Sequence, residues 1–254
     1  MSRTLTPEQQ LQEDEYLLPT HYLDLIPQLS YMWQIPESYR RICRELLGPI
    51  RGQRVLDACC GDGRMCYNLR GDNLKLVGID FSSRALAFAR AFNPDVEFVV
   101  GDLTTYRPAE KFDAIFLIEA LEHFQPDFIA NVLENLWSCL ADDGLLIMTV
   151  PSTLLAKSRK HYQHFTPESL RATLSPWFTI QTLLGQLRIG WKWRLYHRLV
   201  SGQFVLGALR LKFRIMRPYF AIIDKLFKSI ETCRPEDGQR LIAACRKNHR
   251  VLRS

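Results

Sequence analysis

Val55-Leu56-Asp57-Ala58-Cys59-Cys60-Gly61-Asp62-Gly63-Arg64 is the stretch that decides the fold of this 254-residue chain. The apolar run from Arg54 to Cys60 predicts a buried strand, and the pattern from Met65 to Leu69 predicts a helix. Gly61 and Gly63 lie between them, where any side chain would keep a ligand away from the backbone N–H groups at the start of the helix. The stretch therefore predicts a strand, a glycine turn and a helix that together bind a ligand.

Asp80 ends a second predicted strand, which covers the apolar run from Leu74 to Ile79. An acidic side chain about 20 residues after a glycine turn, at the end of the next strand, is placed to bind the hydroxyl groups of a ribose. The alternative role for Asp80 is to cap the helix that follows. A Gly-x-Gly turn alone indicates little, but with the second strand and its terminal aspartate it indicates a nucleotide-type cofactor.

The composition narrows the class of protein. Hydrophobic residues make up 47% of the chain and charged residues 24%, as in ordinary soluble domains. No apolar run reaches the length of a membrane span, and the polar start from Met1 to Glu15 does not resemble a signal peptide. The seven cysteines show no C-x-x-C spacing. We therefore expect reduced thiols and a cytoplasmic protein.

Strands and helices alternate along the middle of the chain, which predicts an α/β fold with a parallel, doubly wound sheet. Ser82 or Ser83 is expected to cap a helix that runs to Phe92, and Thr166 to cap another. A further helix is predicted from Phe128 to Leu140. The later strands are predicted at Val96–Val100, Phe112–Ile118, Leu145–Val150, Phe178–Leu184 and Gly238–Arg246.

These motifs resemble, in order, those of class I S-adenosylmethionine (SAM)-dependent methyltransferases. The loop of that family reads Asp/Glu-x-Gly-x-Gly-x-Gly; Asp57, Gly61 and Gly63 match it, and Cys59 replaces the first glycine. Gly101-Asp102-Leu103 resembles the motif that contacts adenine. The resemblance implies a Rossmann-like, seven-stranded doubly wound sheet whose last strand runs antiparallel between strands five and six.

The resemblance also implies SAM as the cofactor and assigns residues to it. The expected cofactor-binding residues are Asp57, Cys59, Gly61, Gly63, Asp80, Phe81, Asp102, Leu103 and Ile118. It divides the chain into an N-terminal helical cap (1–50), a SAM-binding core (51–187), a basic amphipathic insertion (188–237), and the last strand with its tail (238–254). The cap is expected either to cover the SAM site or only to pack on the sheet, and Tyr22, Tyr31 and Trp33 suit both roles.

Glu119-Ala120-Leu121-Glu122-His123 follows the fourth predicted strand, where groups that act on the methyl acceptor are expected. On a helical turn Glu119 and Glu122 share a face, with His123 beside them. Small-RNA 2′-O-methyltransferases and ubiquinone-pathway O-methyltransferases have a similar Glu-x-x-Glu-His motif that ligates a divalent metal. In the small-RNA enzymes a later histidine completes the set; by position His164 is the better match here and His161 the second.

The resemblance thus implies a Mg²⁺, Mn²⁺ or Zn²⁺ site at Glu119, Glu122, His123 and His164, which would activate an acceptor hydroxyl. The metal-free alternative makes His123 or His164 the general base, beside Glu122. In a third interpretation these residues only anchor loops.

The segment from Arg188 to Arg234 contains eleven Lys and Arg residues, opposed only by Asp224 and Glu231, in a chain of net charge +6. Leu209 to Ile215 alternates as a strand would, although its neighbours favour a helix, and Phe220 to Ile230 has the pattern of an amphipathic helix. Residues 188–231 are expected to form a lid, to contact an anionic membrane or lipid-linked substrate, or to bind nucleic acid.

The sequence as a whole predicts a SAM-dependent methyltransferase that methylates an oxygen of a small molecule, a glycan or a lipid-linked sugar. Arg159, Lys160 and Tyr162 favour an acceptor with acidic or phosphate groups. The alternatives are metal-assisted 2′-O-methylation of RNA and a SAM-fold protein that binds without catalysis. The expected location is cytoplasmic, with peripheral membrane contact if the insertion provides it.

Overall fold

A computed structural model describes residues 5–19, 21–22, 34–48, 53–70, 73–208 and 217–248, and for residues 201–208 and 217 it describes only the backbone. Its strands are β1 (Arg54–Ala58), β2 (Lys75–Asp80), β3 (Glu97–Val100), β4 (Phe112–Ile118), β5 (Leu140–Pro151), β6 (Phe178–Arg188), β7 (Thr232–Cys233) and β8 (Gly238–Lys247). Its helices are α1 (Pro7–Glu15), α2 (Gln34–Leu47), α3 (Arg64–Asn68), α4 (Ser83–Phe92), α5 (Pro126–Cys139), α6 (Pro167–Leu174), α7 (Trp191–Ala208) and α8 (Arg217–Lys228), with short 3₁₀ turns η3 (Leu121–His123) and η4 (Pro235–Asp237).

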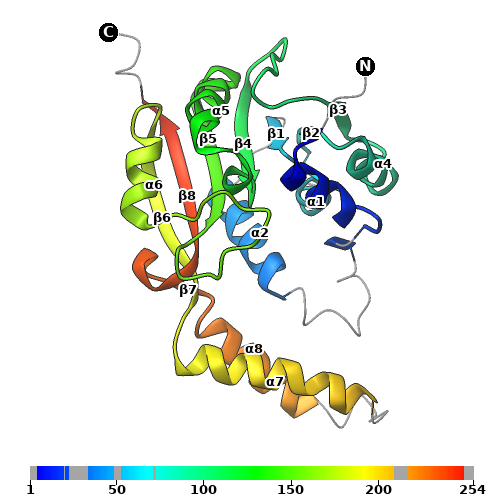
Figure 1. The fold of residues 1–254 in the computed structure, drawn as a ribbon, viewed down its shortest axis with the longest axis vertical. Coiled ribbons are helices and arrows are strands. Elements are labelled where there is room, and N and C mark those ends of the chain that lie inside the picture. The colour runs from blue at the N-terminus through cyan, green and yellow to red at the C-terminus, as the bar shows by residue number, and fades with distance from the viewer. Residues whose placement is uncertain are drawn as a thin grey trace.

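The eight strands form one sheet in the order β3-β2-β1-β4-β5-β8-β6-β7 (Figure 1). Neighbouring strands from β3 to β5 pair in parallel, and β8 lies antiparallel between β5 and β6. This confirms the predicted α/β class, the doubly wound order and the place of the antiparallel strand. In such a sheet the carboxyl ends of the parallel strands meet at one edge, where ligands bind.

The predicted count of seven strands needs one correction. The two-residue strand β7 pairs antiparallel with Gly185 and Gln186 of β6 and adds an eighth strand at the edge. It lies inside the predicted insertion 188–237, because the chain that returns from α8 runs back along β6 before it enters β8. The alternating stretch from Leu209 to Ile215 lies outside the described residues, as do Tyr31 and Trp33.

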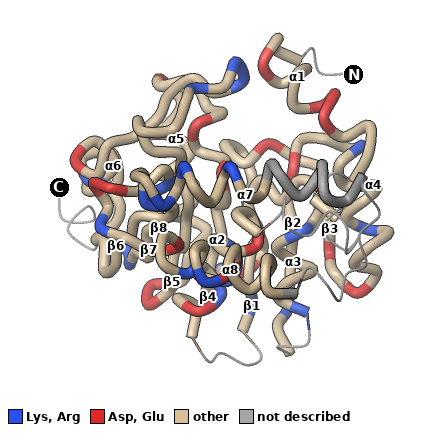
Figure 2. The backbone as a smooth tube through the Cα atoms, turned by 90° about the horizontal axis from the view of Figure 1, so that it is seen from below, with Lys and Arg blue, Asp and Glu red and all other residues tan. Residues whose placement is uncertain are grey.

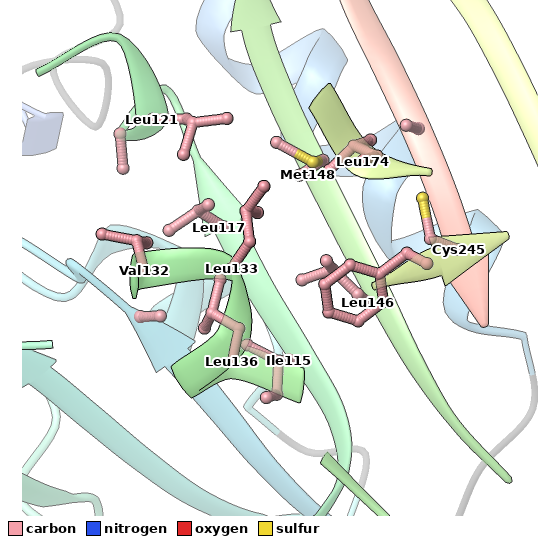
Figure 3. Close-up of a cluster of buried hydrophobic side chains, with 14 of the residues drawn as sticks. Ile115, Leu117, Leu121, Val132, Leu133, Leu136, Leu146, Met148, Leu174 and Cys245 are labelled. Atoms are coloured by element: carbon pink, nitrogen blue, oxygen red, sulfur yellow. The ribbon is translucent and has the colours of Figure 1, made fainter. Parts of the chain in front are cut away.

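Two hydrophobic layers hold helices on opposite faces of the sheet. On one face, α5 and α6 pack on β4, β5 and β8, and Figure 3 shows Leu117, Leu133 and Leu146 interdigitating there. On the other face, α2 and α3 cover the same strands through Ile42, Met65 and their neighbours. The strands are therefore apolar on both sides, as expected for a parallel sheet.

Local signals in the sequence fix several helix starts. Thr6 and Thr166 each accept a hydrogen bond from the backbone N–H three residues on, with proline next to them in the first turn. Ser82 caps α4 in the same way. The caps at Ser82 and Thr166 confirm the predicted starts of α4 and α6.

Helices α7 and α8 form a hairpin that projects from the body of the molecule beyond the end of β6 (Figure 1). Ile223, Phe227 and Ile230 of the predicted amphipathic segment are buried against Tyr196 and Leu187. The apolar face predicted for α8 is thus covered by the chain itself. No helix among the described residues is long and apolar enough to cross a membrane.

Candidate active site

The turn after β1 is left-handed at three positions, which brings its backbone toward the edge of the sheet. Cys59 has φ 57°, Gly61 φ 53° and Gly63 φ 80°. A Cβ on Gly63 would lie 2.9 Å from the Cβ of Ala89. A Cβ on Gly61 would collide with the hydroxyl of Tyr16. Gly63 therefore lets α3 pack close to α4, and Gly61 keeps the turn open beneath the N-terminal segment.

Asp80 holds this turn in place from the end of β2. Its carboxylate accepts hydrogen bonds from the N–H of Gly61 at 2.8 Å and the N–H of Ser82 at 2.9 Å. Burial raises the pKa of Asp80 to about 6, against the opposing effect of these two N–H groups. The side chain that caps α4 is Ser82, so the carboxylate of Asp80 is left to fix the turn and to face the cavity.

Two adjoining cavities open at this edge of the sheet. One has a volume of about 430 Å³ and lies against Phe81, Asp102 and Leu103. The other, of about 400 Å³, lies against Asp57 and Ile118. They share six lining residues: Gln9, Cys59, Asp80, Phe81, His123 and Phe124. Eight of the nine residues predicted to bind the cofactor line one or both cavities; the exception is Gly63, which packs between helices.

The N-terminal segment lies over these cavities. Gln9 of α1 lines both of them, and Tyr16 lines the second. Glu8 accepts a hydrogen bond from the hydroxyl of Tyr162 at 2.7 Å, and Glu15 pairs with Lys160 at 2.6 Å. No residue of α1 is buried in the protein core. Within the predicted cap, α1 thus lies over the cavities, whereas α2 packs on the sheet.

Arg40 was not predicted as a site residue, although it lines the second cavity beside Asp57. Its side chain is 5% exposed, its Nη1 donates no hydrogen bond to the described residues, and the carboxylate of Glu37 is 4.0 Å away. A buried guanidinium facing a cavity suits an anionic group of a ligand. The signal in the sequence was an arginine within the buried stripe of α2, between Tyr39 and Ile42.

The two glutamates of the Glu-x-x-Glu-His motif point to different partners. Glu119 has φ 48°, and its carboxylate pairs with Arg240 of β8 at 2.9 Å. Glu122 lies in the 3₁₀ turn η3 and is completely buried, and neither of its carboxylate oxygens has a hydrogen-bond partner among the described residues. Burial raises the pKa of Glu122 well above its ordinary value, and the charge of Glu119 raises it further.

The hydrogen bonds of three histidines, His123, His161 and His164, fix their tautomers. A carbonyl oxygen can only accept, so Nδ1 of His164, 3.1 Å from the carbonyl of Leu155, carries the proton. Its Nε2 then accepts from Nδ1 of His161, 2.8 Å away. Nδ1 of His123 likewise donates to the carbonyl of Lys160 at 3.1 Å. The Nε2 atoms of His123 and His161 therefore keep free lone pairs.

Both of these imidazoles are neutral at physiological pH. Burial, with the charge of Lys160 nearby, lowers the pKa of His123 to about 3. Burial and the neighbouring His164 lower the pKa of His161 to about 4. One ligand atom each from Glu122, His123 and His161 lies within 4.8 Å of the others. The structure thus brings His161 together with Glu122 and His123. His164 is hydrogen-bonded to His161 and lies outside this group, and Glu119 pairs with Arg240.

The donor set of Glu122, His123 and His161 fits a divalent cation. It offers a buried carboxylate without a hydrogen-bond partner in the described part of the chain. It also offers two lone pairs on imidazoles whose other ring nitrogens are hydrogen-bonded, as is usual for metal-binding histidines. One carboxylate with two imidazoles is a set typical of zinc, manganese and iron. The predicted set differs, because it contained Glu119 and His164 in place of His161.

The sheet order and the glycine turn, held by Asp80 at the end of β2, are those of the class I SAM-dependent methyltransferase fold. A family model described as a methyltransferase domain matches residues 31–188, more than half of the chain. The chain belongs to this methyltransferase-domain family. The predicted family, enzyme class and SAM cofactor are thereby confirmed, and the residue assignments stay predictions.

Curated relatives share only parts of the chain. The demethylmenaquinone methyltransferase of Beutenbergia cavernae is 35% identical over 35% of this chain and 37% of its own length. The trans-aconitate 2-methyltransferase of an Azoarcus species is 30% identical over 54% of this chain and 52% of its own length. The chain thus spans about half or less of the length of these relatives.

A solved structure shares the fold over nearly the whole chain. The N-methyltransferase NodS from Bradyrhizobium japonicum, in complex with S-adenosyl-L-homocysteine, matches with a TM-score of 0.62 and 16% sequence identity. The match covers 96% of this chain and all of that one. At this identity the likeness shows the fold alone.

Proposed function

We propose that this protein transfers the methyl group of SAM to a hydroxyl oxygen of a small acceptor that carries an acidic group. The observation that carries the proposal is the cluster of Glu122, His123 and His161, which lines the same cavity as the glycine turn. Methyl transfer from a sulfonium needs alignment of the two reactants and, for a hydroxyl, a group that takes its proton. The cluster supplies such a group where the acceptor must lie.

The cofactor is held between the turn after β1 and the two acidic strand ends. Asp80 is placed for the ribose, and Phe81, Asp102 and Leu103 for the adenine, whose cavity they line. Arg40 is placed for the carboxylate of the methionine part, because its buried guanidinium faces the cavity beside Gly61. This arrangement directs the sulfonium methyl toward the second cavity.

In the reaction the bond between sulfur and the methyl carbon breaks while the bond between that carbon and the acceptor oxygen forms. The hydroxyl proton passes to the carboxylate of Glu122, which lines the cavity without a hydrogen-bond partner among the described residues and whose pKa is raised by burial. Burial lowers the pKa of His123 to about 3, which makes it a weaker base. S-adenosyl-L-homocysteine leaves as a neutral thioether. In the alternative with a divalent cation, Glu122, His123 and His161 would be its ligands, and the cation would lower the pKa of the hydroxyl so that its proton is lost to solvent instead of to Glu122.

The acidic part of the acceptor is proposed from two cations in the cavity wall. Arg240 and Lys160 line the second cavity, where they pair with Glu119 and Glu15 and can also face an anionic group of the acceptor. Both curated relatives above are named for small organic molecules, and trans-aconitate is an anion. The helix α1 covers the cavity and would keep water from the reaction, which strengthens the attraction between these cations and an anionic group.

The test measures release of S-adenosyl-L-homocysteine from SAM with a panel of hydroxylated carboxylates, quinols and sugar phosphates, and with RNA. We expect turnover with a hydroxylated small anion, and a fall in kcat of about 10²-fold or more in Glu122→Gln. Glu119→Gln is the matched control, since Glu119 pairs with Arg240, and its kcat should stay within about tenfold of the wild type. Both variants should bind SAM like the wild type.

Three results would overturn the proposal. Turnover on RNA alone would make the acceptor a nucleic acid. Full turnover in Glu122→Gln would remove the proposed proton acceptor. SAM binding without turnover on any acceptor would indicate a binding protein. Titration of both variants with Mn²⁺ and Zn²⁺ adds a readout independent of turnover: metal affinity should fall in Glu122→Gln and persist in Glu119→Gln.

A further inference from the structure

The hairpin of α7 and α8 is a separate surface that the methyl-transfer chemistry does not use. Its inner faces bury Tyr196, Ile223 and Phe227 against one another. At its base the hydroxyl of Tyr196 donates to Gln34 of α2 at 2.9 Å, and Gln34 donates to Asp224 at 3.0 Å. The hairpin is therefore fixed to the body of the protein and presents its outer face in a defined direction.

The outer face of α7 combines large apolar side chains with arginines. Trp191 is 65% exposed and Leu195 40% exposed, and Arg194 and Arg198 lie exposed on the same side of the helix. These four residues follow the spacing of three and four that places side chains on one helical face. The buried Tyr196 lies on the opposite face. Burial of the inner face leaves the Trp191 face open to a partner.

The charged side chains of α7 are all basic. Helix α7 contains Lys192, Arg194 and Arg198 and no acidic residue. Figure 2, which views the molecule from the hairpin side, shows Lys and Arg but no Asp or Glu along the described part of α7. At the base of the hairpin Arg188 pairs with Asp237 at 3.3 Å, whereas among the described residues no ion pair engages Arg194 or Arg198. The partner that complements this face is therefore anionic.

We propose that the outer face of α7 binds the surface of an anionic membrane. Trp191 and Leu195 would enter the headgroup region, and Arg194 and Arg198 would lie against acidic headgroups. Tryptophan prefers the interface between water and hydrocarbon, and each Lys or Arg near an anionic surface adds attraction. An RNA partner would use the arginines but would leave the exposed aliphatic side chains of Leu195 and Ile189 without a matching surface.

The position of the hairpin determines which edge of the sheet would face the membrane. Strands β5 and β6 both pair antiparallel with β8, so β6 runs parallel to β5. The hairpin follows the carboxyl end of β6. The glycine turn, Asp80 and the Glu122 cluster lie at the carboxyl ends of the parallel strands, on the same edge of the sheet. A protein bound through α7 would therefore hold its active-site edge toward the membrane. Binding itself does not depend on the proposed methyl acceptor.

The test is co-sedimentation of the full chain with vesicles of phosphatidylcholine alone, and of phosphatidylcholine with about one third phosphatidylglycerol. We expect the protein to bind the mixed vesicles, and to bind the neutral ones at least tenfold less. Binding to the mixed vesicles should fall as salt is raised. The double variant Arg194→Glu with Arg198→Glu should lose at least tenfold in affinity for the mixed vesicles. Trp191→Ser should weaken binding at every salt concentration.

The matched control reverses two exposed cations elsewhere, Lys75→Glu with Arg171→Glu, which changes the net charge by the same amount. This control should bind the mixed vesicles within about twofold of the wild type, since only charges near the surface act. SAM binding, measured on every variant, reports that the fold is intact. Equal loss in both double variants, or an α7 variant that loses RNA retention and keeps vesicle binding, would overturn the proposal.

Discussion

The part of the site proposed to bind the cofactor (the cofactor end) and the part proposed to bind the acceptor (the acceptor end) are built in different ways. The cofactor end is made largely of backbone: a turn of consecutive residues after β1, held by the carboxylate of Asp80 through the N–H of Gly61 at 2.8 Å. The acceptor end is made of side chains from separate segments, since Glu122 and His123 follow β4 and His161 comes from the loop after β5. A change of one side chain should therefore affect only one of the two ends.

This difference predicts which substitutions should affect each end. Backbone groups cannot be mutated away, so the cofactor end depends on the few side chains that shape the turn. The acceptor end depends on a chain of hydrogen bonds from Leu155 through His164 to His161, so a residue that does not touch the ligand can still matter. Four predictions follow this contrast, from the largest expected effect to the smallest.

The largest effect is a pH dependence of stability at the cofactor end. Burial raises the pKa of Asp57 from 3.8 to about 7, although the thiol of Cys66 donates to it at 3.4 Å. Between these values the folded protein keeps a proton that the unfolded chain releases, so the stability of the wild type falls as pH rises from about 4 to 7. The variant Asp57→Asn has no ionisable group at this position, so its free energy of unfolding should not fall for this reason.

Urea unfolding at pH 4 and pH 7 measures the effect. The free energy of unfolding of Asp57→Asn, minus that of the wild type, should grow by up to about 4 kcal/mol over this range. The exposed Asp95→Asn is the control, and its difference from the wild type should stay nearly flat. A constant difference for Asp57→Asn would show that Asp57 ionises in the folded protein as it does in the unfolded chain.

The second effect is on cofactor affinity. Asp80→Ala removes the acceptor of two backbone N–H groups and the carboxylate proposed for the ribose hydroxyls, so SAM affinity should fall by about 10²-fold. Isothermal titration calorimetry with SAM measures it, with the exposed Asp143→Ala as control. Unchanged affinity in Asp80→Ala would place the ribose elsewhere and would contradict the assignment of the cofactor cavity.

Much of the cofactor end could be predicted from the sequence because its signals are local. A strand, two glycines and a helix start are adjacent in the chain, and the alternation of strands and helices fixes which strand ends meet at one edge. Eight predicted residues lie at the cavities for this reason. The spacing of Gly63 pointed to the same turn, but only the structure shows that it packs against Ala89.

The acceptor end was harder to predict because its partners depend on contacts between distant segments. Spacing alone suggested that Glu119 and Glu122 act together, but Glu119 meets Arg240, which lies on β8 and is far away in sequence. The choice between His161 and His164 depends on the path of the loop after β5, which no local pattern specifies. Arg40 was missed for the same reason: its burial beside the cavity follows from how α2 packs on the sheet.

The third effect tests the hydrogen-bond chain at the acceptor end. His164→Phe removes the acceptor that orients Nδ1 of His161, so kcat should fall by about 10-fold, while SAM affinity stays as in the wild type. His197→Phe is the matched control, because His197 is exposed on α7 away from both cavities. A drop in SAM affinity that matches the drop in kcat would mean that the two ends are not separable.

The smallest effect tests the turn itself. Cys59 adopts φ 57°, a left-handed conformation that costs a residue with a Cβ about 1 to 2 kcal/mol and that glycine adopts without strain. Part of this gain is lost to the greater freedom of glycine in the unfolded chain, so Cys59→Gly should raise the free energy of unfolding by up to about 1 kcal/mol. SAM affinity should change less than about threefold, because the backbone that forms the turn is kept.

The neighbouring Cys60→Gly is the control for this prediction. Cys60 has no left-handed φ and packs in a buried cluster with Leu86 and Phe98, so removal of its side chain should destabilise the protein. Thermal unfolding of the two variants should therefore move in opposite directions. If Cys59→Gly destabilised the protein as Cys60→Gly does, packing of the thiol rather than backbone strain would decide this position, and the cofactor end would depend on side chains in the same way as the acceptor end.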